Sequence, residues 1–422
     1  MTNETMWMGM IPESWKSIPL KYVFDIQKRI AGKEGYTVLS ITQSGIKPKN
    51  MDAQGQYAQD YSNYQLVYPG DFAMNHMDLL TGWVDISQYE GVTSPDYRVF
   101  VNRDANQFCS EYYKYVFQYC YSNKVFYGMG QGVSGFGRWR LPADMFLNFR
   151  LPVPRLDEQK RIATFLEQKI CDIDVVISEA KASIEEYKAW KASIIYEAVT
   201  KGIDPNVEMK DSGIVWIGKM PVGWSRTKLS NCFAIIGSGT TPTSDDNSYY
   251  EGNINWLQSG DINGGSVCDT KKCISAEAYE RFSALKIYKA PFLVIAMYGA
   301  SIANTSIVEI DACTNQACCV FCDANELVNL DYAFYSVLAA KEHLLLAARG
   351  GTQPNINQDI LKKLMIPIPP KAEQEEIVGY LKQKCNDIGI LIAEKEALIA
   401  DLESYKKALI FEVVTGKRRV TE

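Results

Sequence analysis

A segment of 50 residues occurs twice in this chain of 422 residues, and it constrains the fold more than any other feature. The copies span residues 151–200 and 366–415, align without a gap at an offset of 215 residues, and are identical at 19 of 50 positions. Each opens on Pro-x-Pro, continues with Glu-Gln and ends on Glu-x-Val-Thr. Because proline cannot occupy a helix interior, the prolines mark a helix start. Each copy therefore predicts an extended entry followed by one long helix.

Apolar residues recur behind the prolines at the spacing of a coiled coil or helix bundle. About 44 helical residues span roughly 60 Å, and a helix of that length with one apolar stripe needs a partner. We expect the two copies to pair antiparallel; two ordinary core helices are the alternative, which the length disfavours. Isoleucines at 170, 177, 184, 392 and 399 widen the stripe beside the seam. The predicted seam consists of Ile162, Leu166, Ile173, Val176, Tyr187, Trp190 and Ile194, and of Ile377, Leu381, Ile388, Leu391, Leu398, Leu402, Tyr405 and Leu409.

The repeat extends over the rest of the chain. Trp15 matches Trp224 at an offset of 209, and Phe72 matches Phe292 at 220. We therefore predict an α+β fold, a tandem duplication of a mixed α/β globular domain followed by a long helix. The offsets change within residues 25–67 and 116–141 of the first half, and 234–287 and 336–356 of the second, so these windows diverge. The expected parts are two globular domains (1–150 and 216–365), two long-helix spacers (151–202 and 366–422) and a connector (203–215).

Local signals within the globular domains are mixed. Residues 36–41 and 292–297 are rich in β-branched and aromatic residues and predict strands. Residues 110–127 and 331–349 predict amphipathic helices, with Asp331 as the N-cap of the second.

Composition narrows the function. A formal net charge of −6 disfavours nucleic-acid binding through a positive field of the whole protein. Residues 16–49, however, include seven basic and only two acidic residues, and such a local basic patch can meet phosphates. The first ten residues lack a secretory signal, and the apolar stretch at 292–303 is too short to span a bilayer, so we expect a cytoplasmic protein. Eleven cysteines then favour free thiols. Zinc at Cys319-x-x-Cys322 is the alternative, disfavoured by its apolar, strand-like surroundings.

Two segments are spelled like nucleotide-binding motifs, but the residues around them do not fit such motifs. Gly130-x-Gly132-x-x-Gly135 follows a predicted helix, whereas a dinucleotide fingerprint follows a strand. The phosphate-loop spelling that begins at Gly213 has Met220 where a magnesium-binding hydroxyl is needed. We therefore expect no catalytic residues and no metal site.

Loops with nucleic-acid chemistry remain. Arginine reads guanine edges, Asn and Gln read adenine, and Lys, Ser and Thr hold phosphates. Ordinary polar surface loops are the alternative reading. The candidate DNA-binding residues are Gln43, Ser44, Lys47, Lys49, Asn50, Arg138, Arg140, Ser238, Thr240, Thr241, Gln258, Ser259, Arg349 and Gln353.

Together these segments resemble the specificity subunit of type I restriction-modification systems over nearly the whole chain. The resemblance is carried by Pro-x-Pro with Glu-Gln in both copies, by Asp211-Ser-Gly-Ile-Val-Trp-Ile-Gly218, by Thr314-Asn-Gln-Ala317 and by the ending Val414-Thr-Gly-Lys-Arg418.

The resemblance implies a non-catalytic protein in which each globular domain reads one half of a bipartite double-stranded DNA target. The paired helices would set the spacing and dock two methylation subunits, and restriction subunits would complete the nuclease. S-adenosylmethionine, ATP and magnesium would belong to those partners, and no membrane is implied. A coiled-coil scaffold without DNA binding is the alternative. The candidate partner-binding or spacer residues are Glu158, Gln159, Tyr187, Trp190, Glu373, Gln374 and Tyr405.

Overall fold

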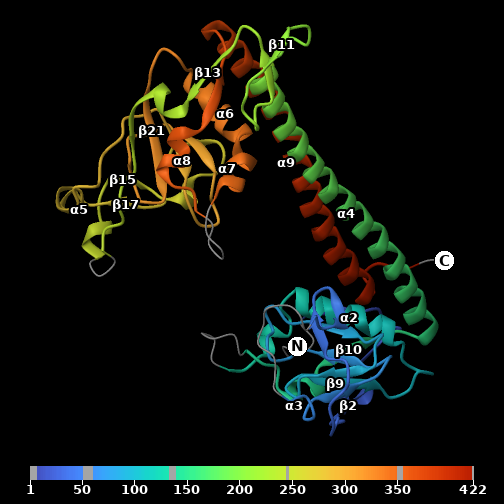
Figure 1. Cartoon of the computed structure of the whole chain (residues 1–422). Coiled ribbons are helices and arrows are strands. Elements are labelled where there is room, and N and C mark those ends of the chain that lie inside the picture. Colours follow the sequence, from blue (N-terminus) through green and yellow to red (C-terminus); the bar gives the residue numbers. More distant parts are fainter. Residues whose placement is uncertain (1–6, 51–59, 133–138, 244–246, 349–354, 421–422) are drawn as a thin grey trace. The chain divides into compact units, whose positions relative to one another are not determined.

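The computed structural model describes residues 7–50, 60–132, 139–243, 247–348 and 355–420. The chain forms two compact units, one of residues 1–181 with 396–422 and the other of residues 182–395. Each long helix belongs to both units. Helix α4 (Leu156–Lys201) starts in the first unit and ends in the second, and α9 (Lys371–Val414) does the reverse (Figure 1).

The first unit is built on a four-stranded antiparallel sheet of order β2-β9-β6-β7. Phenylalanines of its strands pack edge-on against Phe117 of helix α2, with Phe72 and Phe117 ring centroids 5.6 Å apart. Its elements are β1 (Lys16–Pro19), η1 (Leu20–Tyr22), β2 (Phe24–Gln27), β3 (Leu39–Thr42), β4 (Gly45–Pro48), β5 (Gln65–Val67), β6 (Phe72–Met74), β7 (Val84–Ile86), β8 (Gly91–Thr93), β9 (Arg98–Asn102), α2 (Ser110–Ser122), η2 (Tyr127–Met129), α3 (Ala143–Asn148) and β10 (Arg150–Val153).

The second unit repeats this plan with a five-stranded sheet of order β14-β21-β18-β19-β16 and a smaller sheet of order β17-β15-β20. Its elements are β11 (Met209–Asp211), β12 (Lys219–Pro221), β13 (Ser225–Lys228), η3 (Leu229–Cys232), β14 (Phe233–Gly237), η4 (Asn247–Tyr250), β15 (Ile254–Leu257), η5 (Ser259–Asp261), β16 (Ser266–Val267), β17 (Cys273–Ile274), α5 (Ala276–Arg281), β18 (Phe292–Ala296), β19 (Thr305–Val308), β20 (Cys313–Thr314), β21 (Cys318–Ala324), α6 (Leu330–Ala339), α7 (Lys341–Ala347), α8 (Gln358–Lys363) and β22 (Met365–Ile368).

The duplication predicted from the sequence is confirmed by the sheet order. Strands β2, β9, β6 and β7 of the first domain occupy the order that β14, β21, β18 and β19 occupy in the second. Each Pro-x-Pro element is an edge strand of its own domain: β10 pairs with β1, and β22 pairs with β13. Because proline lacks the N–H that a central strand needs, a two-stranded edge pair suits it. The α+β tandem duplication is therefore the fold.

The end of each long helix completes the core of the domain that the other helix follows. In the first unit Val413 and Val414 of α9 join the core around α2, and the Tyr112 hydroxyl donates to the Val414 carbonyl at 2.9 Å. In the second unit the hydroxyl of the equivalent Tyr332 donates to the Val199 carbonyl of α4 at 3.2 Å. Each unit thus joins the start of one helix to the end of the other, which makes the predicted pairing antiparallel.

The predicted seam is wrong by one position over part of its length. Val176 and Trp190, and likewise Leu391, Leu398 and Tyr405, are exposed. The isoleucines that were expected to widen the stripe take their place, since Ile177 and Ile184 are buried and Ile392 and Ile399 are half-buried. In the first unit the seam also holds Lys406 of α9, whose Nζ lies 2.6 Å from the Asp174 carboxylate of α4. A heptad read from hydrophobicity alone cannot separate a seam from an apolar flank beside it.

Smaller expectations are also corrected. The helix expected at 331–349 is two helices, α6 and α7, and its N-cap is Asn329, whose side chain accepts from the N–H groups of Asp331 and Tyr332. The strand expected at 36–41 is β3, which begins at Leu39. Helix α2 ends at Ser122, five residues before the expected end. The strand expected at 292–297 is confirmed as β18.

Candidate nucleic-acid interface

The first predicted cluster lies on an exposed hairpin of the first domain. The tight turn between β3 and β4 presents Gln43 and Ser44, and the Thr42 and Ser44 hydroxyls are 2.9 Å apart. Gly45 adopts a φ of 96°, which an L side chain rarely accepts. Lys47 lies on β4, and Lys49 and Asn50 follow it, all exposed. The hairpin thus brings the five candidates together.

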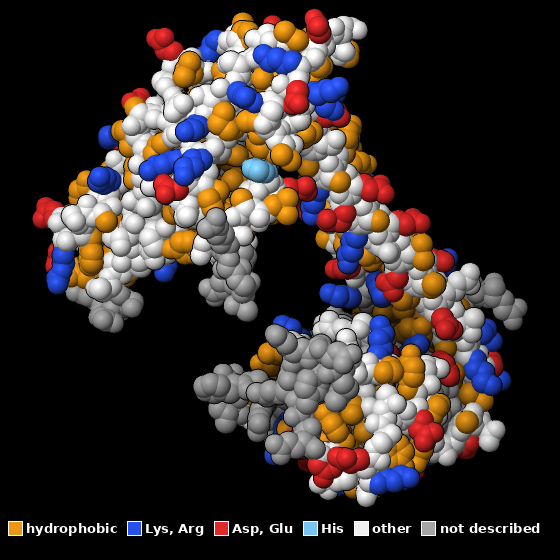
Figure 2. All heavy atoms as spheres, in the orientation of Figure 1, with side chains coloured by type: hydrophobic (Ala, Val, Ile, Leu, Met, Phe, Trp, Pro, Cys, Tyr) orange, Lys and Arg blue, Asp and Glu red, His pale blue; other side chains and the backbone are white. Residues whose placement is uncertain are grey.

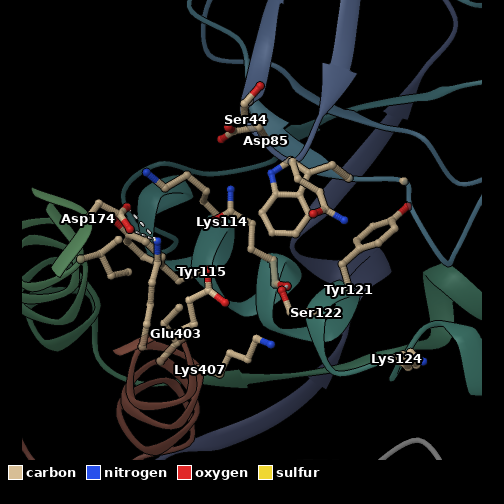
Figure 3. Close-up of a pocket in the computed structure, with 18 of the residues that line it drawn as sticks. Ser44, Asp85, Lys114, Tyr115, Tyr121, Ser122, Lys124, Asp174, Glu403 and Lys407 are labelled. Atoms are coloured by element: carbon tan, nitrogen blue, oxygen red, sulfur yellow. Dashed lines mark hydrogen bonds and ion pairs between the residues drawn. The ribbon is translucent and has the colours of Figure 1, made fainter. Parts of the chain in front are cut away.

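Gln43 and Ser44 line a cleft of about 780 Å³ whose other wall is the helix pair of the same unit (Figure 3). Lysines and acids alternate around it, with Lys114, Lys124, Lys406 and Lys407 against Asp85, Asp174 and Glu403. Burial raises the pKa of Asp85, and the Ile86 N–H and the Lys114 charge oppose that effect. Basic and acidic side chains are likewise interspersed over the helices in Figure 2. Local contacts, rather than one positive field, are available to a polyanion here.

The second predicted cluster of the first domain surrounds a pocket of about 390 Å³. Arg140 is exposed, and its N–H and C=O bond to the backbone of Gln131 at 3.2 and 2.9 Å. His76 and Arg98 line the same pocket. Arg138 lies outside the described residues.

Arg98 is 5% exposed, and its guanidinium is held in place from two sides. Its Nη2 donates to the Leu141 carbonyl at 3.0 Å, and its Cζ lies 4.5 Å from the centroid of the Phe146 ring. Its Nη1 has no hydrogen-bond partner among the described residues. Burial lowers the pKa of Arg98 to about 10, so the side chain remains a cation at neutral pH.

His76 completes the pocket as a neutral ring. Burial lowers the pKa of His76 to about 3, and the charges of Arg98 and Arg140 add to the effect. The Leu141 N–H donates to the His76 backbone carbonyl at 3.0 Å, so Leu141 ties both the His76 backbone and the Arg98 side chain to the segment that carries Arg140. The arrangement offers cationic donors at a pocket whose described lining holds no carboxylate.

The candidates of the second domain are spread over two loops. Ser238, Thr240 and Thr241 follow β14, and the Thr241 hydroxyl donates to Gln316 at 2.7 Å. Gln258 and Ser259 lie at the turn η5, where the Gln258 N–H donates to the Asp261 carboxylate at 2.9 Å. Ser238 lines a pocket of about 470 Å³ with Met297, Tyr298, Gly299, Asn355, Ile356, Asn357 and Gln358. Arg349 and Gln353 lie outside the described residues.

The Glu-Gln pairs, predicted as partner-binding or spacer residues, fasten each domain to its own helix. Gln159 is fully buried, accepts from the Cys109 N–H at 2.8 Å and donates to the Pro154 carbonyl at 2.9 Å. Glu158 accepts from the Trp15 indole N–H at 3.0 Å. In the second domain, Gln374 and Glu373 make the same contacts with Asn329, Pro369 and Trp224. These hydrogen bonds therefore join residues within one unit.

The aromatic candidates on the helices differ from these. Trp190 is 51% exposed and Tyr405 is 48% exposed, while Tyr187 is half-buried. Trp190 and Tyr405 are related by the 215-residue offset of the repeat. Equivalent positions on the two helices therefore each present a large aromatic side chain to solvent.

The cysteine motif does not form a metal site. Cys319 and Cys322 of β21 are three residues apart, so they point to opposite faces of the sheet and enter different cores. Among the described residues no group of three metal-ligating side chains occurs, and the cysteines there are free. In the part of the chain that the structure describes, no helix is both long enough and apolar enough to cross a bilayer.

Sequence reasoning missed Arg98 and His76. Met74 pairs with Arg98 across β6 and β9. The Leu141 N–H bonds to the His76 carbonyl and the equivalent Ile356 N–H to the Met297 carbonyl, so Met74 corresponds to Ile295, whose partner on β21 is Cys319. A charged residue in a strand whose repeat carries an uncharged cysteine is a signal, but the strand register was needed to find it.

Both halves of the chain are similar to known proteins. The family model for the type I restriction modification DNA specificity domain matches twice, at residues 12–186 and 221–399. The chain is 24% identical over 435 residues to a protein named as the MjaX specificity subunit of a type I restriction enzyme from Methanocaldococcus jannaschii, covering 98% of this chain and 96% of that one. It is 27% identical over 285 residues to the MjaVIII specificity subunit of the same organism, covering 65% of this chain and 64% of that one.

Solved structures share the fold. A chain from a study of complex assembly and conformational transition in a type I restriction-modification system has a TM-score of 0.73 at 17% identity, covering 97% of this chain and all of that one. The HsdS subunit from Thermoanaerobacter tengcongensis has a TM-score of 0.51 at 16% identity, covering 98% of this chain and all of that one. With both halves matched by one family model, the chain belongs to the type I restriction-modification DNA specificity family.

Proposed function

We propose that this chain is the DNA-recognition subunit of a type I restriction-modification complex and that it acts without an active site of its own. The observation that carries this is the presence of two specificity domains on one chain, built on one scaffold with different exposed loops. A duplicated chain differs from a symmetric dimer because its halves can diverge, so they can read different sequences. Each domain then reads one half of a bipartite double-stranded DNA target.

The long helices set the distance between the half-sites. A helix advances about 1.5 Å per residue, so helix length translates directly into a distance along DNA. Support comes from the way each helix start is fixed by an edge strand, a buried glutamine and a tryptophan contact. A helix whose start is fixed in this way keeps its register with the domain that precedes it.

The same helices dock two methylation subunits, and restriction subunits join them. Exposed Trp and Tyr are enriched where proteins bind one another. Trp190 and Tyr405 occupy equivalent positions of the repeat, which suits two copies of one partner. S-adenosylmethionine, ATP and magnesium belong to those partner subunits and take no part in the chemistry of this chain.

Trp190→Ala and Tyr405→Ala are each expected to remove one of the two methylation subunits. Truncation of an interface aromatic typically costs about 2 kcal/mol, or roughly 30-fold in affinity. Because both side chains are about half exposed, the unfolding midpoint should hold. Light scattering of the purified complex measures the stoichiometry.

Each single variant should bind one methylation subunit and the double variant none. Glu186→Ala, at an exposed position of α4, is the control and should bind two. Full stoichiometry in the double variant would contradict docking at these residues.

A footprint on DNA separates this function from the scaffold alternative. The complex of this chain with its methylation subunits should protect two separated DNA segments, and raised salt should weaken binding because phosphates are contacted. A complex that assembles without a footprint at low salt, and whose assembly is insensitive to salt, would instead support a scaffold without DNA binding.

A further inference from the structure

The two domains carry a pocket at the same place in their common scaffold. Helix α3 and helix α8 are equivalent at the offset of 215, as are the residues before them, Arg140 with Asn355 and Leu141 with Ile356. In the first domain the Leu141 N–H donates to the His76 carbonyl at 3.0 Å, and in the second the Ile356 N–H donates to the Met297 carbonyl at 2.7 Å. Arg140 and Asn355 each form a β-bridge, with Gln131 and Tyr298 respectively.

The linings of these equivalent pockets differ in charge. Arg98, Arg140 and His76 line the first, and its described lining contains two cations and no acid. Asn355, Tyr298 and Met297 line the second, and its described lining contains no charged side chain. The scaffold is therefore shared while the chemistry at the pocket is not.

The fold does not demand an arginine at position 98. His76 and Met297 are equivalent, so Met74 and Ile295 two residues before them are equivalent, and their strand partners Arg98 and Cys319 correspond. Cys319 is fully buried in the core that also holds Leu361. Phe146, which lies 4.5 Å from the Arg98 guanidinium, is replaced by Leu361 at the offset of 215. A cation with its stacking partner thus stands in the first domain where an uncharged buried pair, Cys319 and Leu361, suffices in the second.

Arg98 is also incompletely paired. It is 95% buried, one of its terminal nitrogens donates to the Leu141 carbonyl, and the other has no partner among the described residues. A buried cation without an acid is stabilised by an acceptor-rich ligand at the adjoining pocket. Exposed Arg140 lies at the same pocket and can meet that ligand directly.

We infer that the equivalent pockets are the base-reading sites of the two domains, with Arg140 reading guanine in one half-site and Asn355 reading adenine in the other. Guanine presents two acceptors in the major groove, N7 and O6, which suit the paired donors of one arginine. Adenine presents one acceptor and one donor, which suit the amide of asparagine. Arg98 is a positioning residue that lies behind Arg140 and favours an acceptor edge over a donor edge.

Bases rather than phosphates are favoured because the equivalent positions differ. Phosphate contacts carry no sequence information, so two domains on one scaffold can keep them in common. A cationic pocket in one domain and an uncharged one in the other is instead what different base preferences require. The inference rests on the proposed function for its ligand, duplex DNA, and names the residues through which each domain discriminates.

The test exchanges the equivalent residues. Arg140→Asn and Asn355→Arg are made in the full chain, each complex is assembled with its methylation subunits, and the methylated motif is mapped with the wild type beside it. Arg140→Asn should relax one guanine position of one half-site, with discrimination there falling about 5- to 150-fold, and leave the other half-site unchanged. Asn355→Arg should alter one adenine position of the other half-site.

Two further variants keep the result interpretable. Arg98→Met should weaken discrimination at the same guanine, and its thermal unfolding midpoint reports whether the buried site still folds. Lys21→Gln removes an exposed charge of the same domain outside the pocket and should leave the motif unchanged.

Three outcomes would overturn the inference. A uniform loss of affinity over all sequences with Arg140→Asn, together with a salt slope lower by about one, would identify a phosphate contact. A wild-type motif that both exchanges leave intact would mean that the pockets do not face the bases. Loss at both half-sites from one exchange would indicate a structural role. No motif from the wild type would contradict the proposed function itself, which separates the two failures.

Discussion

One additional heptad in both α4 and α9 is expected to lengthen the gap between the two half-sites by about three base pairs and to abolish modification of the original target. Seven helical residues add about 10 Å, and base pairs are spaced about 3.4 Å apart. The seam repeats every seven residues, through Leu166, Ile173 and Ala180 in one helix and Leu381 and Ile388 in the other. A whole heptad therefore keeps the apolar positions facing each other. Mapping the motif methylated by the variant complex measures the gap directly.

An insertion of four residues in both helices is the matched control. It adds about 6 Å but rotates the residues beyond it out of the seam, as a stutter does. The variant should lose folding or assembly instead of acquiring a longer target. A heptad variant that methylates the original motif with its original gap would contradict a spacer role for the helices.

Gln159→Leu is expected to destabilise the first unit by about 3 kcal/mol or more. The Gln159 side chain accepts from the Cys109 N–H at 2.8 Å and donates to the carbonyls of Gln107 and Pro154 at 3.2 and 2.9 Å. Leucine fits the volume but leaves three buried backbone groups without a partner, and each unsatisfied group costs about 1–3 kcal/mol. The loss also detaches α2 from the start of α4. Chemical denaturation followed by far-UV circular dichroism measures the change.

The repeat supplies both a replicate and a control for this prediction. Gln374→Leu should have the same effect in the second unit, since Gln374 bonds to Asn329, Leu327 and Pro369 in the same way. Gln168→Leu, at an exposed position of α4, should change the free energy of unfolding by less than about 0.5 kcal/mol. Equal stability of Gln159→Leu and Gln168→Leu would mean that the buried hydrogen bonds do not fasten the domain to its helix.

The fold was predictable because the same sequence pattern occurs in both halves of the chain. Prolines mark where α4 and α9 can begin, and the uninterrupted apolar pattern after them predicts their length. The exact seam was not predictable, because Val176 and Trp190 are as apolar as core residues yet are exposed. Exposed apolar residues that serve an interface are indistinguishable in sequence from those that serve a core.

The candidate site was predictable in part. Gln43 and Ser44 could be chosen because they are polar and follow a predicted strand. Arg140 could be chosen because it is an arginine in a segment where the two halves diverge. Arg98 could not be found in this way, since its role is visible only once β6 is known to lie beside β9 and Cys319 is known to be the equivalent residue of the second domain. The Glu-Gln pairs were predicted as partner-binding or spacer residues, because a sequence motif does not show which groups its side chains bond.

The methylation pattern in a host without adenine methylation tests the central claim most directly. This chain is expressed with the methylation subunit of its system, genomic DNA is sequenced for N6-methyladenine, and the methylation subunit alone is the control. A bipartite motif that appears only when both proteins are present is the expected result. Methylation of the same motif without this chain, or no motif from a soluble and associated pair, would contradict its role as the DNA-recognition subunit.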